Sequence, residues 1–323
     1  MTPRRRFHET MAFGCPDRVP LWDEGLRDDV LTRWYAEGLP ADTDPATLFE
    51  VDRRERIDVN LDPTPASPLL KDRDAVRVWR ERLDAEDRSR LPDDWAGRLR
   101  RWRGRDHVLE LPIHRGLFRT MEVGCWADIE PVIYLLADRP AFVREIMDEY
   151  ASFAAKVAER ILQDVDVDFV SFSEPVGSNH APIISPALYK DVVLDSYAPV
   201  IEVLQRHGVR WIVFVTYANA RALLRDVIDA GFNVLWAVET ESTAMDYGSI
   251  RREYGRDLRL IGGIDLDVLM GDEAAIRHEL VTKVPPLLAD GGYIPLADGR
   301  VRSSVPFRNY EYYRRMLQHL VEA

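Results

Sequence analysis

The stretch "DVDFVSFSEPVGSNHAPIISP" (166–186) holds an apolar run that reaches Glu174 and stops at Pro175, with His180 six residues beyond the glutamate. A short, continuous apolar run of this kind is typical of a parallel strand that is covered on both faces. Residues 185–208 then show a helical pattern that ends at a glycine, a common helix stop signal. The stretch therefore predicts a strand, a loop and a helix, and it raises the question of whether Glu174 and His180 act together.

The same alternation of strand and helix continues to the end of the chain. Alternating strands and helices with short connections indicate βα units and a parallel sheet. No GxGxxG motif follows any of these strands, so a dinucleotide-binding fold loses its best sequence support. The pattern predicts strands at 209–217, 232–239, 258–265 and 293–299, and helices at 220–231, 244–255, 272–292 and 307–323.

The N-terminal half is less regular. We expect the first two strands at "RVPLWDEG" (18–25) and "HVLELPIH" (107–114), with a helical insertion of about residues 40–105 between them. The alternation fits both a closed barrel and an open doubly wound sheet. In a barrel, the insertion would lie as a lid over the mouth. Charged amphipathic helices are expected within this insertion at 78–102. The segment 142–165 carries apolar side chains at spacings of three and four, which predicts a helix packed on the core. The sequence thus favours one domain spanning residues 1–323.

Composition narrows the function classes. The net charge is −12 and 46% of the 323 residues are hydrophobic, which allows a full core and argues against a nucleic-acid surface. No apolar run approaches the roughly 20 residues that span a bilayer, and the first residues lack the apolar segment of a secretory signal. The two cysteines, Cys15 and Cys125, lie in no metal-binding pattern and fit a reducing compartment. We expect a cytoplasmic protein without membrane or nucleic-acid partners.

Polar side chains follow the expected strands. In α/β barrels the chemistry lies at the C-terminal ends of the strands, and carboxylates that converge there shift one another's pKa, which suits acid–base work or metal binding. Each also has a structural interpretation, as a helix cap or a loop ion pair, although glutamate is a poorer cap than aspartate. A loop histidine such as His180 is more often without a catalytic role. The candidates are Trp22, Glu24, His114, Arg115, Glu174, Tyr217, Asn219, Glu239, Asp298 and Arg300.

Several segments, in their order and spacing, resemble the uroporphyrinogen decarboxylase superfamily from about residue 15 to 320. The resemblance implies a single (β/α)8 barrel with its site at the strand C-termini, and a homodimer. Its known branches are porphyrinogen decarboxylases, which need no cofactor, and methyltransferases, many of which use zinc and take methyl from a corrinoid protein. The segments are "RVPLWDEG", "RWYAEGLP", "SEPVGSNHAPIISPALYKDVV", "VIDAGFNVLWAVE", "LRLIGGID" and "LLADGGYIPLADGRVRSSVPFRNYEYYRRML".

The departures from the family separate its branches. Where the decarboxylases carry an arginine-rich RQAGR segment, this chain reads "LWDEGLRDD", which would repel an octa-acid porphyrinogen. Where thiol-activating methyltransferases carry His and Cys zinc ligands, it reads "FVTYANA" (214–220). The nearest branch is a bacterial methyltransferase-like group whose SED, DxDG and DH motifs are replaced here, with Pro175 in place of a second acid. A tight zinc or cobalt site is therefore not expected.

Three functions are compatible with these residues. The first is metal-independent decarboxylase or lyase chemistry on a small carboxylate-bearing substrate other than uroporphyrinogen, with no cofactor. The second is a methyltransferase that acts on a methylated or methoxylated small molecule with a corrinoid partner, where zinc or a corrinoid would be expected. The third is a barrel that binds a ligand without catalysis. We assign catalytic roles to Glu174, His180, Tyr217 and Glu239, and substrate-binding roles to the other candidates.

Overall fold

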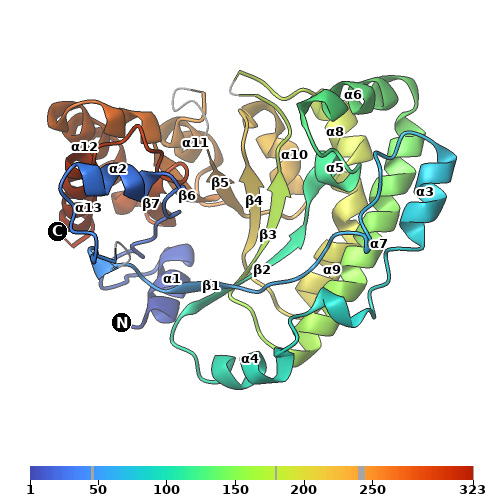
Figure 1. Ribbon diagram of the computed structural model, residues 1–323, viewed down its shortest axis with the longest axis horizontal. Coiled ribbons are helices and arrows are strands. Elements are labelled where there is room, and N and C mark those ends of the chain that lie inside the picture. The colour runs from blue at the N-terminus through green and yellow to red at the C-terminus, as the bar shows by residue number, and fades with distance from the viewer. Residues whose placement is uncertain (45–46, 179, 239–243, 323) are drawn as a thin grey trace. The chain divides into compact units, whose positions relative to one another are not determined.

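The computed structural model describes residues 1–44, 47–178, 180–238 and 244–322, which form two compact units (Figure 1). We call them the terminal unit, made of residues 1–54, 106–108 and 234–323, and the central unit, made of residues 55–105 and 109–233. Each unit consists of parallel strands with helices between them. The α/β fold expected from the alternating pattern is confirmed.

In the central unit, β2 (Val108–His114), β3 (Phe169–Glu174) and β4 (Ile212–Thr216) pair in parallel in the order of the chain. The register places Glu174 beside Thr216, so the C-terminal ends of β3 and β4 meet at one edge. The helices of this unit are α3 (Arg73–Arg80), α4 (Trp95–Trp102), α5 (Gly116–Thr120), α6 (Ile129–Asp138), α7 (Pro140–Asp164), α8 (Pro186–Val192), α9 (Ala198–Arg206) and α10 (Leu224–Asp229).

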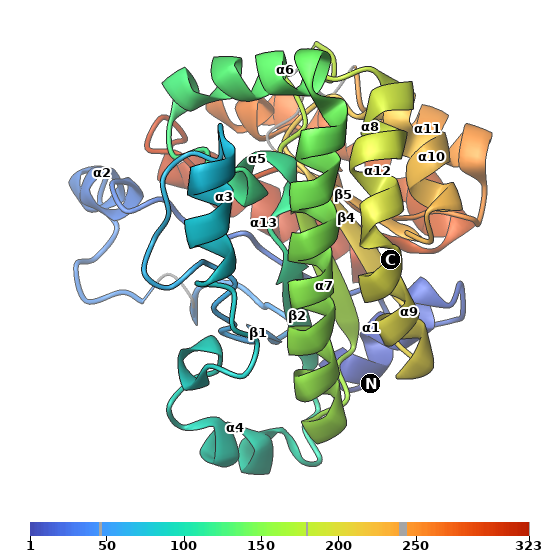
Figure 2. The same cartoon turned by 90° about the vertical axis from the view of Figure 1, so that its right-hand side faces the viewer.

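The long helix α7 confirms the prediction for 142–165 and buries one apolar face. Part of the expected insertion packs on it, as Figure 2 shows for α3. Arg80 of α3 pairs with Glu145 at 2.7 Å and with Glu149, both on α7. The ring of Trp79 lies 6.4 Å from that of Tyr150. These contacts hold α3 against α7, and the closing of a barrel mouth by this segment stays a prediction.

The continuous helix expected at 185–208 is wrong. The segment forms α8, a short 3-10 turn η4 (Leu194–Tyr197) and α9, with Pro199 in the first turn of α9. Proline lacks the N–H that a helix interior needs, so it marks the start of a new helix. The break matters for the site, because the buried side chains of Tyr189 and Tyr197 come from the separate pieces α8 and η4.

In the terminal unit, β5 (Val234–Ala237), β6 (Arg259–Ile264) and β7 (Tyr293–Ala297) also pair in parallel. The helix expected at 272–292 is confirmed as Glu273–Asp290, with Pro285 and Pro286 near its C-terminal end. No helix among the described residues is long and apolar enough to cross a membrane. The helices of this unit are α1 (Pro3–Met11), α2 (Val30–Ala36), α11 (Tyr247–Tyr254), the 3-10 turn η6 (Leu266–Met270), α12 (Glu273–Asp290) and α13 (Phe307–Glu322).

The first strand expected at 18–25 is also wrong. The segment is extended but forms no strand, and its only ladder contact among the described residues is a parallel bridge between Leu26 and Val301. Pro20 has no N–H to give, and the N–H of Leu21 donates to the carboxylate of Asp52 at 2.8 Å instead of to a strand. A short strand, β1, occurs later at Arg54–Arg56. Apolar alternation alone could not reveal that a side chain would take the backbone donor.

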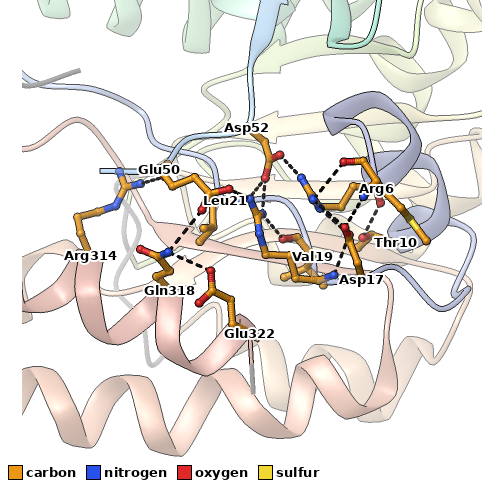
Figure 3. A network of polar contacts seen from close by, with 12 residues as sticks. Arg6, Thr10, Asp17, Val19, Leu21, Glu50, Asp52, Arg314, Gln318 and Glu322 are labelled. Carbon is orange, nitrogen blue, oxygen red and sulfur yellow. Dashed lines mark hydrogen bonds and ion pairs between the residues drawn. The ribbon is translucent and has the colours of Figure 1, made fainter. Parts of the chain in front are cut away.

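Asp52 lies at the centre of a buried ion network (Figure 3). Its carboxylate pairs with Arg6 of α1 and, at 2.5 Å, with Arg18. Arg6 also pairs with Asp17 at 2.8 Å, and Arg18 pairs with Glu50. The network therefore joins α1 to the extended segment and to residues 50–52.

Candidate functional site

Glu174 ends β3 and has no exposed surface. Its Oε1 accepts a hydrogen bond from the backbone N–H of Leu117 at 3.1 Å and another from the hydroxyl of Tyr197. Its Oε2 is buried and has no hydrogen-bond partner among the described residues. One oxygen of this carboxyl is thus fixed by neutral donors, while the other is available for a proton or a ligand.

Burial raises the pKa of Glu174 to about 7, even though the nearby hydroxyls of Tyr197 and Tyr189 and the N–H of Leu117 each lower it. Desolvation dominates because none of the hydrogen-bond partners carries a positive charge. The carboxyl therefore holds a proton at slightly acidic pH and exchanges it near neutrality, as a general acid or base requires.

Tyr189 and Tyr197 are functional candidates that the sequence analysis missed. Both side chains are fully buried, and burial beside Glu174 raises the pKa of each hydroxyl well above its usual value. They are therefore hydrogen-bond donors and not bases. The Tyr189 hydroxyl interacts with Glu174 electrostatically, but its geometry does not make a hydrogen bond with any described residue. The sequence feature that could have indicated them is the pair of tyrosines on the apolar face of the segment that follows Glu174.

His114 ends β2 and lies in an aromatic layer rather than on a surface, with 2% of the residue exposed. Its ring centroid is 4.5 Å from that of Tyr197 and 5.7 Å from that of Phe172. Burial, with a smaller effect of Arg115, lowers the pKa of His114 to about 3. The imidazole is therefore neutral, and since Nδ1 accepts the N–H of Gly116 at 3.0 Å, we assign the proton to Nε2.

Gly116 allows α5 to approach Glu174 closely. Its φ is +79°, and a Cβ atom there would lie 2.2 Å from the carbonyl oxygen of Ser173 and 2.8 Å from Oε1 of Glu174. Any side chain at this position would push α5 away from β3 and break the bond from Leu117. This glycine fixes the cluster, which we call the Glu174 cluster: His114, Glu174, Tyr189 and Tyr197.

Arg115 is already occupied by acidic partners. It pairs with Asp62 at 2.8 Å and with Glu122 at 3.2 Å, and its side chain is 10% exposed. Two carboxylates neutralise its charge, so it is a poorer anchor for a substrate carboxylate than the sequence indicated. Arg115 also lowers the pKa of Glu122, although burial is the larger effect and raises it.

The remaining candidates of the central unit lie on its loops. Asn219 joins the loops after β3 and β4, because its Nδ2 donates to the carbonyl of His180 at 2.9 Å and its N–H donates to that of Ser178 at 2.9 Å. His180 is exposed, and Glu174 takes its hydrogen bonds from Tyr197 and Leu117 instead. Tyr217, 43% exposed, directly follows β4. Among the described residues, no hydrogen bond pairs the carboxyl of Glu174 with the imidazole of His180.

In the terminal unit, Trp22 and Glu24 belong to one cluster. The guanidinium of Arg54 lies 5.0 Å from the ring of Trp22 and 4.6 Å from that of Trp236, and it pairs with Glu24 at 3.4 Å. The rings of Trp22 and Trp236 stack at 6.0 Å. Glu24 therefore holds a cation that packs on two aromatic faces.

Asp298 and Arg300 follow β7. Asp298 is buried, and its Oδ1 accepts the N–H of Leu266 at 3.0 Å, so it caps the turn η6. Arg300 is exposed. Glu239, the remaining catalytic candidate, lies outside the described residues.

The described side chains do not fit a zinc site. No group of three His, Cys, Asp or Glu residues among them could hold a metal ion, and Cys15 and Cys125 are both exposed and unpaired with each other. At the end of β4, Val215, Thr216 and Tyr217 offer neither imidazole nor thiolate. We therefore derive no step through zinc.

Comparisons with known proteins find matching solved structures. A methyltransferase from Methanosarcina mazei has a similar structure, with a TM-score of 0.60 and 13% identity, covering 99% of this chain and 99% of that chain. A Listeria monocytogenes protein assigned as a vitamin-B12-independent methionine synthase matches at a TM-score of 0.32 and 13% identity, over 68% of this chain and 63% of its own. A search of curated proteins finds no match.

Because the Methanosarcina protein is only 13% identical, this match supports the fold alone. The family is assigned from the sequence. The profile of uroporphyrinogen decarboxylase (URO-D) matches residues 118–294, which is more than half of the chain. This chain belongs to the uroporphyrinogen decarboxylase family.

Proposed function

We propose that this protein is a methyltransferase that demethylates a methoxylated or methylated small molecule, with Glu174 as the proton donor. The observation that carries the proposal is the buried carboxyl of Glu174, whose pKa is about 7 and whose Oε2 has no described partner. In the reaction, the bond between the methyl carbon and the substrate oxygen or nitrogen breaks. The oxygen or nitrogen keeps the electron pair and takes the proton of Glu174, while the methyl group passes to a two-electron nucleophile.

The acceptor in this proposal is a reduced corrinoid carried by a partner protein, which supplies the nucleophile. The chain's own residues hold the proton. Tyr197 and Leu117 N–H fix Oε1. In this proposal the other oxygen, Oε2, carries the proton that passes to the leaving group. The neutral imidazole of His114 packs against Tyr197 and keeps the hydroxyl in place. Protonation of the leaving group of this kind typically contributes about 10²–10⁴-fold to a rate.

A second candidate is decarboxylation of a small carboxylate-bearing molecule, in which Glu174 would protonate the carbon that loses CO₂. The buried, readily protonated carboxyl of Glu174 is compatible with this role as well. We rank this candidate second because Arg115, which directly follows His114 in the chain, is already paired with Asp62 and Glu122.

From the family resemblance we also propose that the chain forms a closed (β/α)8 barrel, that it is a homodimer and that it is located in the cytoplasm. Size-exclusion chromatography with light scattering would measure the oligomeric state.

The test supplies the purified protein with methoxylated phenols or methylated amines and with cob(I)alamin as methyl acceptor, and measures the demethylated product. We expect Glu174→Gln to lower product formation at least a hundredfold. The matched control is Glu110→Gln, which changes another buried strand glutamate, whose Oε1 accepts the Ser171 hydroxyl at 2.7 Å. Release of CO₂ from carboxylic acids without demethylation would favour the second candidate. If Glu174→Gln keeps full turnover, Glu174 is not the proton donor.

A further inference from the structure

A cavity of about 390 Å³ lies in the terminal unit, apart from every residue of the Glu174 cluster. Cavities of 300–1,000 Å³ that combine apolar walls with a few converging polar groups are typical of small-molecule sites. The apolar wall contains Leu26, Leu31, Phe49 and Val51, and the polar wall contains Asp23, Asp44, Tyr310 and Arg314. These residues lie outside 118–294, the range of the family match, and the proposed function gives them no role.

The polar wall is built from buried side chains. The side chain of Arg314 is 3% exposed and Tyr310 is 5% exposed. Both donate to Oδ2 of Asp23, Tyr310 at 2.6 Å and Arg314 as an ion pair. Oδ2 therefore has both of its acceptor positions filled.

The other carboxylate oxygen of Asp23, Oδ1, accepts only one hydrogen bond among the described contacts, from the N–H of Gly25 at 2.5 Å. A carboxylate oxygen can accept two, so among the described contacts one acceptor position of Oδ1 is open. A ligand that donates a hydrogen bond suits this position. A carboxylate ligand does not, because it has no hydrogen to donate to Oδ1 of Asp23 and would bring a second negative charge next to that carboxylate.

Aromatic rings shape the rest of the cavity. Phe49 meets Tyr310 edge-on, with centroids 5.4 Å apart and an angle of 89° between the rings. Tyr310 also packs on Trp34 at 5.0 Å. Phe49 and Tyr310 thus give the cavity aromatic walls, against which a flat ligand ring can pack in edge-to-face or offset contacts.

The buried ion network fixes this wall in advance. Arg314 donates from Nη2 to the carbonyl of Glu50 at 2.9 Å, and the carboxylate of Glu50 pairs with Arg18 (Figure 3). Arg18 in turn pairs with Asp52. Phe49 and Val51 therefore flank a residue that is held at both its backbone and its side chain. A cavity that is already ordered loses less entropy when a ligand binds.

We propose that this cavity binds a small single-ring molecule with a hydroxyl donor, of the phenol class. The ring lies against Phe49, Tyr310 and the aliphatic side chains, and the hydroxyl donates to Oδ1 of Asp23. This site goes beyond the proposed function and does not depend on Glu174, because none of its lining residues belongs to the Glu174 cluster.

The experiment titrates the full chain with 2-methoxyphenol by isothermal calorimetry and saturation-transfer NMR. We expect methoxybenzene, which lacks the donor, and benzoate, which carries a negative charge, to bind at least tenfold more weakly. Equal affinity for 2-methoxyphenol and methoxybenzene would overturn the hydrogen bond to Asp23. Absence of binding by 2-methoxyphenol up to its solubility limit would overturn the site.

Two variants locate the binding. Val51→Trp and Leu31→Trp each fill the cavity from a different side and should lower the affinity at least tenfold. Val51 is 43% exposed, so its variant is the one expected to fold even if Leu31→Trp does not. The matched control is Val281→Trp, which changes a valine of the same unit that is 48% exposed and outside the cavity. If all three variants bind as the wild type does, the ligand lies elsewhere and the proposal is wrong.

These results separate this site from the proposed function. Binding that Val51→Trp weakens, without any demethylation, would support the cavity and count against the role of Glu174. If Val51→Trp demethylates as the wild type does and 2-methoxyphenol shows no measurable binding, the result would support the role of Glu174 and count against the cavity.

Discussion

Two carboxylates at the heart of the two units have nearly the same burial but opposite surroundings. Asp52 in the terminal unit is 4% exposed and meets two guanidinium groups, those of Arg6 and Arg18. Glu174 in the central unit is 0% exposed and meets only hydroxyl and amide donors. The first arrangement compensates a buried charge, whereas the second favours removing the charge by protonation. Burial alone therefore does not tell whether an acid is structural or available for proton transfer.

The pKa directions of neighbouring groups follow this contrast. Arg6 holds the pKa of Asp17 well below its usual range, mainly through a side-chain hydrogen bond. Burial raises the pKa of Glu174 to about 7, in the absence of any cation at hydrogen-bond distance among the described residues. The terminal unit thus uses Asp52 to join segments, while in the central unit Glu174 can titrate near neutral pH.

The largest expected effect comes from breaking the charge balance of the terminal unit. Asp52→Asn leaves Arg6 and Arg18 facing each other without the central anion. Removing one partner of a buried ion pair typically costs about 3–5 kcal/mol, so we expect a loss of that size in the free energy of unfolding, measured with urea. As a control, Glu81→Gln breaks a pair with Arg77 in which both side chains are about two-thirds exposed, and should change little. A small loss for Asp52→Asn would show that the network does not stabilise the unit.

Glu174→Gln should change how stability depends on pH. The folded pKa of about 7 lies above the ordinary value of 4.5, so the folded state binds more protons than the unfolded state between these values. The contribution of Glu174 is therefore fully present below about pH 4.5 and is lost as the pH rises through 7, by on the order of 3 kcal/mol. The variant, which cannot ionise, should lose this part of the pH dependence. Urea unfolding at pH 5 and pH 8 measures the difference, and parallel curves for wild type and variant would contradict it.

Tyr197→Phe sharpens the comparison by removing a neutral donor. The hydroxyl favours the ionised carboxylate, so its loss should raise the pKa of Glu174 further. The lost hydrogen bond also costs roughly 1–3 kcal/mol of unfolding free energy. The carboxyl C=O infrared band, identified by its absence in Glu174→Gln, gives the titration midpoint. Tyr134→Phe, which removes an exposed hydroxyl bonded to Glu130 at 3.0 Å, should leave that midpoint unchanged. A lower midpoint in Tyr197→Phe would be the contrary result.

The smallest effect is expected at the rim of the ion network. Gln318 donates to Glu50 at 3.4 Å and to Glu322 at 2.9 Å, and both contacts are exposed. Gln318→Ala should change the unfolding free energy by less than about 0.5 kcal/mol, because exposed polar contacts exchange with water at little cost. A loss comparable to that of Asp52→Asn would mean that the network acts as a whole rather than through its buried centre.

Local patterns predicted most of the helices and strands well. The strand at 258–265 and the helix at 307–323 were predicted within two residues of β6 and α13, because their apolar spacing is regular and their ends carry clear signals. The strand at 18–25 failed because the carboxylate of Asp52, 31 residues away, binds the N–H of Leu21. The prediction of one helix at 185–208 is wrong because Pro199, which lacks an N–H, lies in the first turn of a new helix, α9, after the turn η4.

The candidate site was harder to predict. Glu174 was named from its place at the end of an apolar strand, and that place is confirmed. Among the described residues, His180 makes no hydrogen bond with Glu174. The sequence did not indicate that Tyr197 bonds to Glu174 or that Gly116 lies against it. Sequence distance from Glu174 carries no information about which side chain lies against it, because partners come from β2, α5, α8 and η4.

The sequence by itself determined the family, the parallel βα pattern and the acid at the end of β3, since each depends on residues that are close in the chain. Only the tertiary structure decided the charge state of that acid. A carboxyl ionises according to its solvent access and the charges within a few ångströms, and both are set by packing. The same glutamate beside an arginine would stay charged like the acids of the Asp52 network, and here, beside Tyr197 and His114, it can keep its proton.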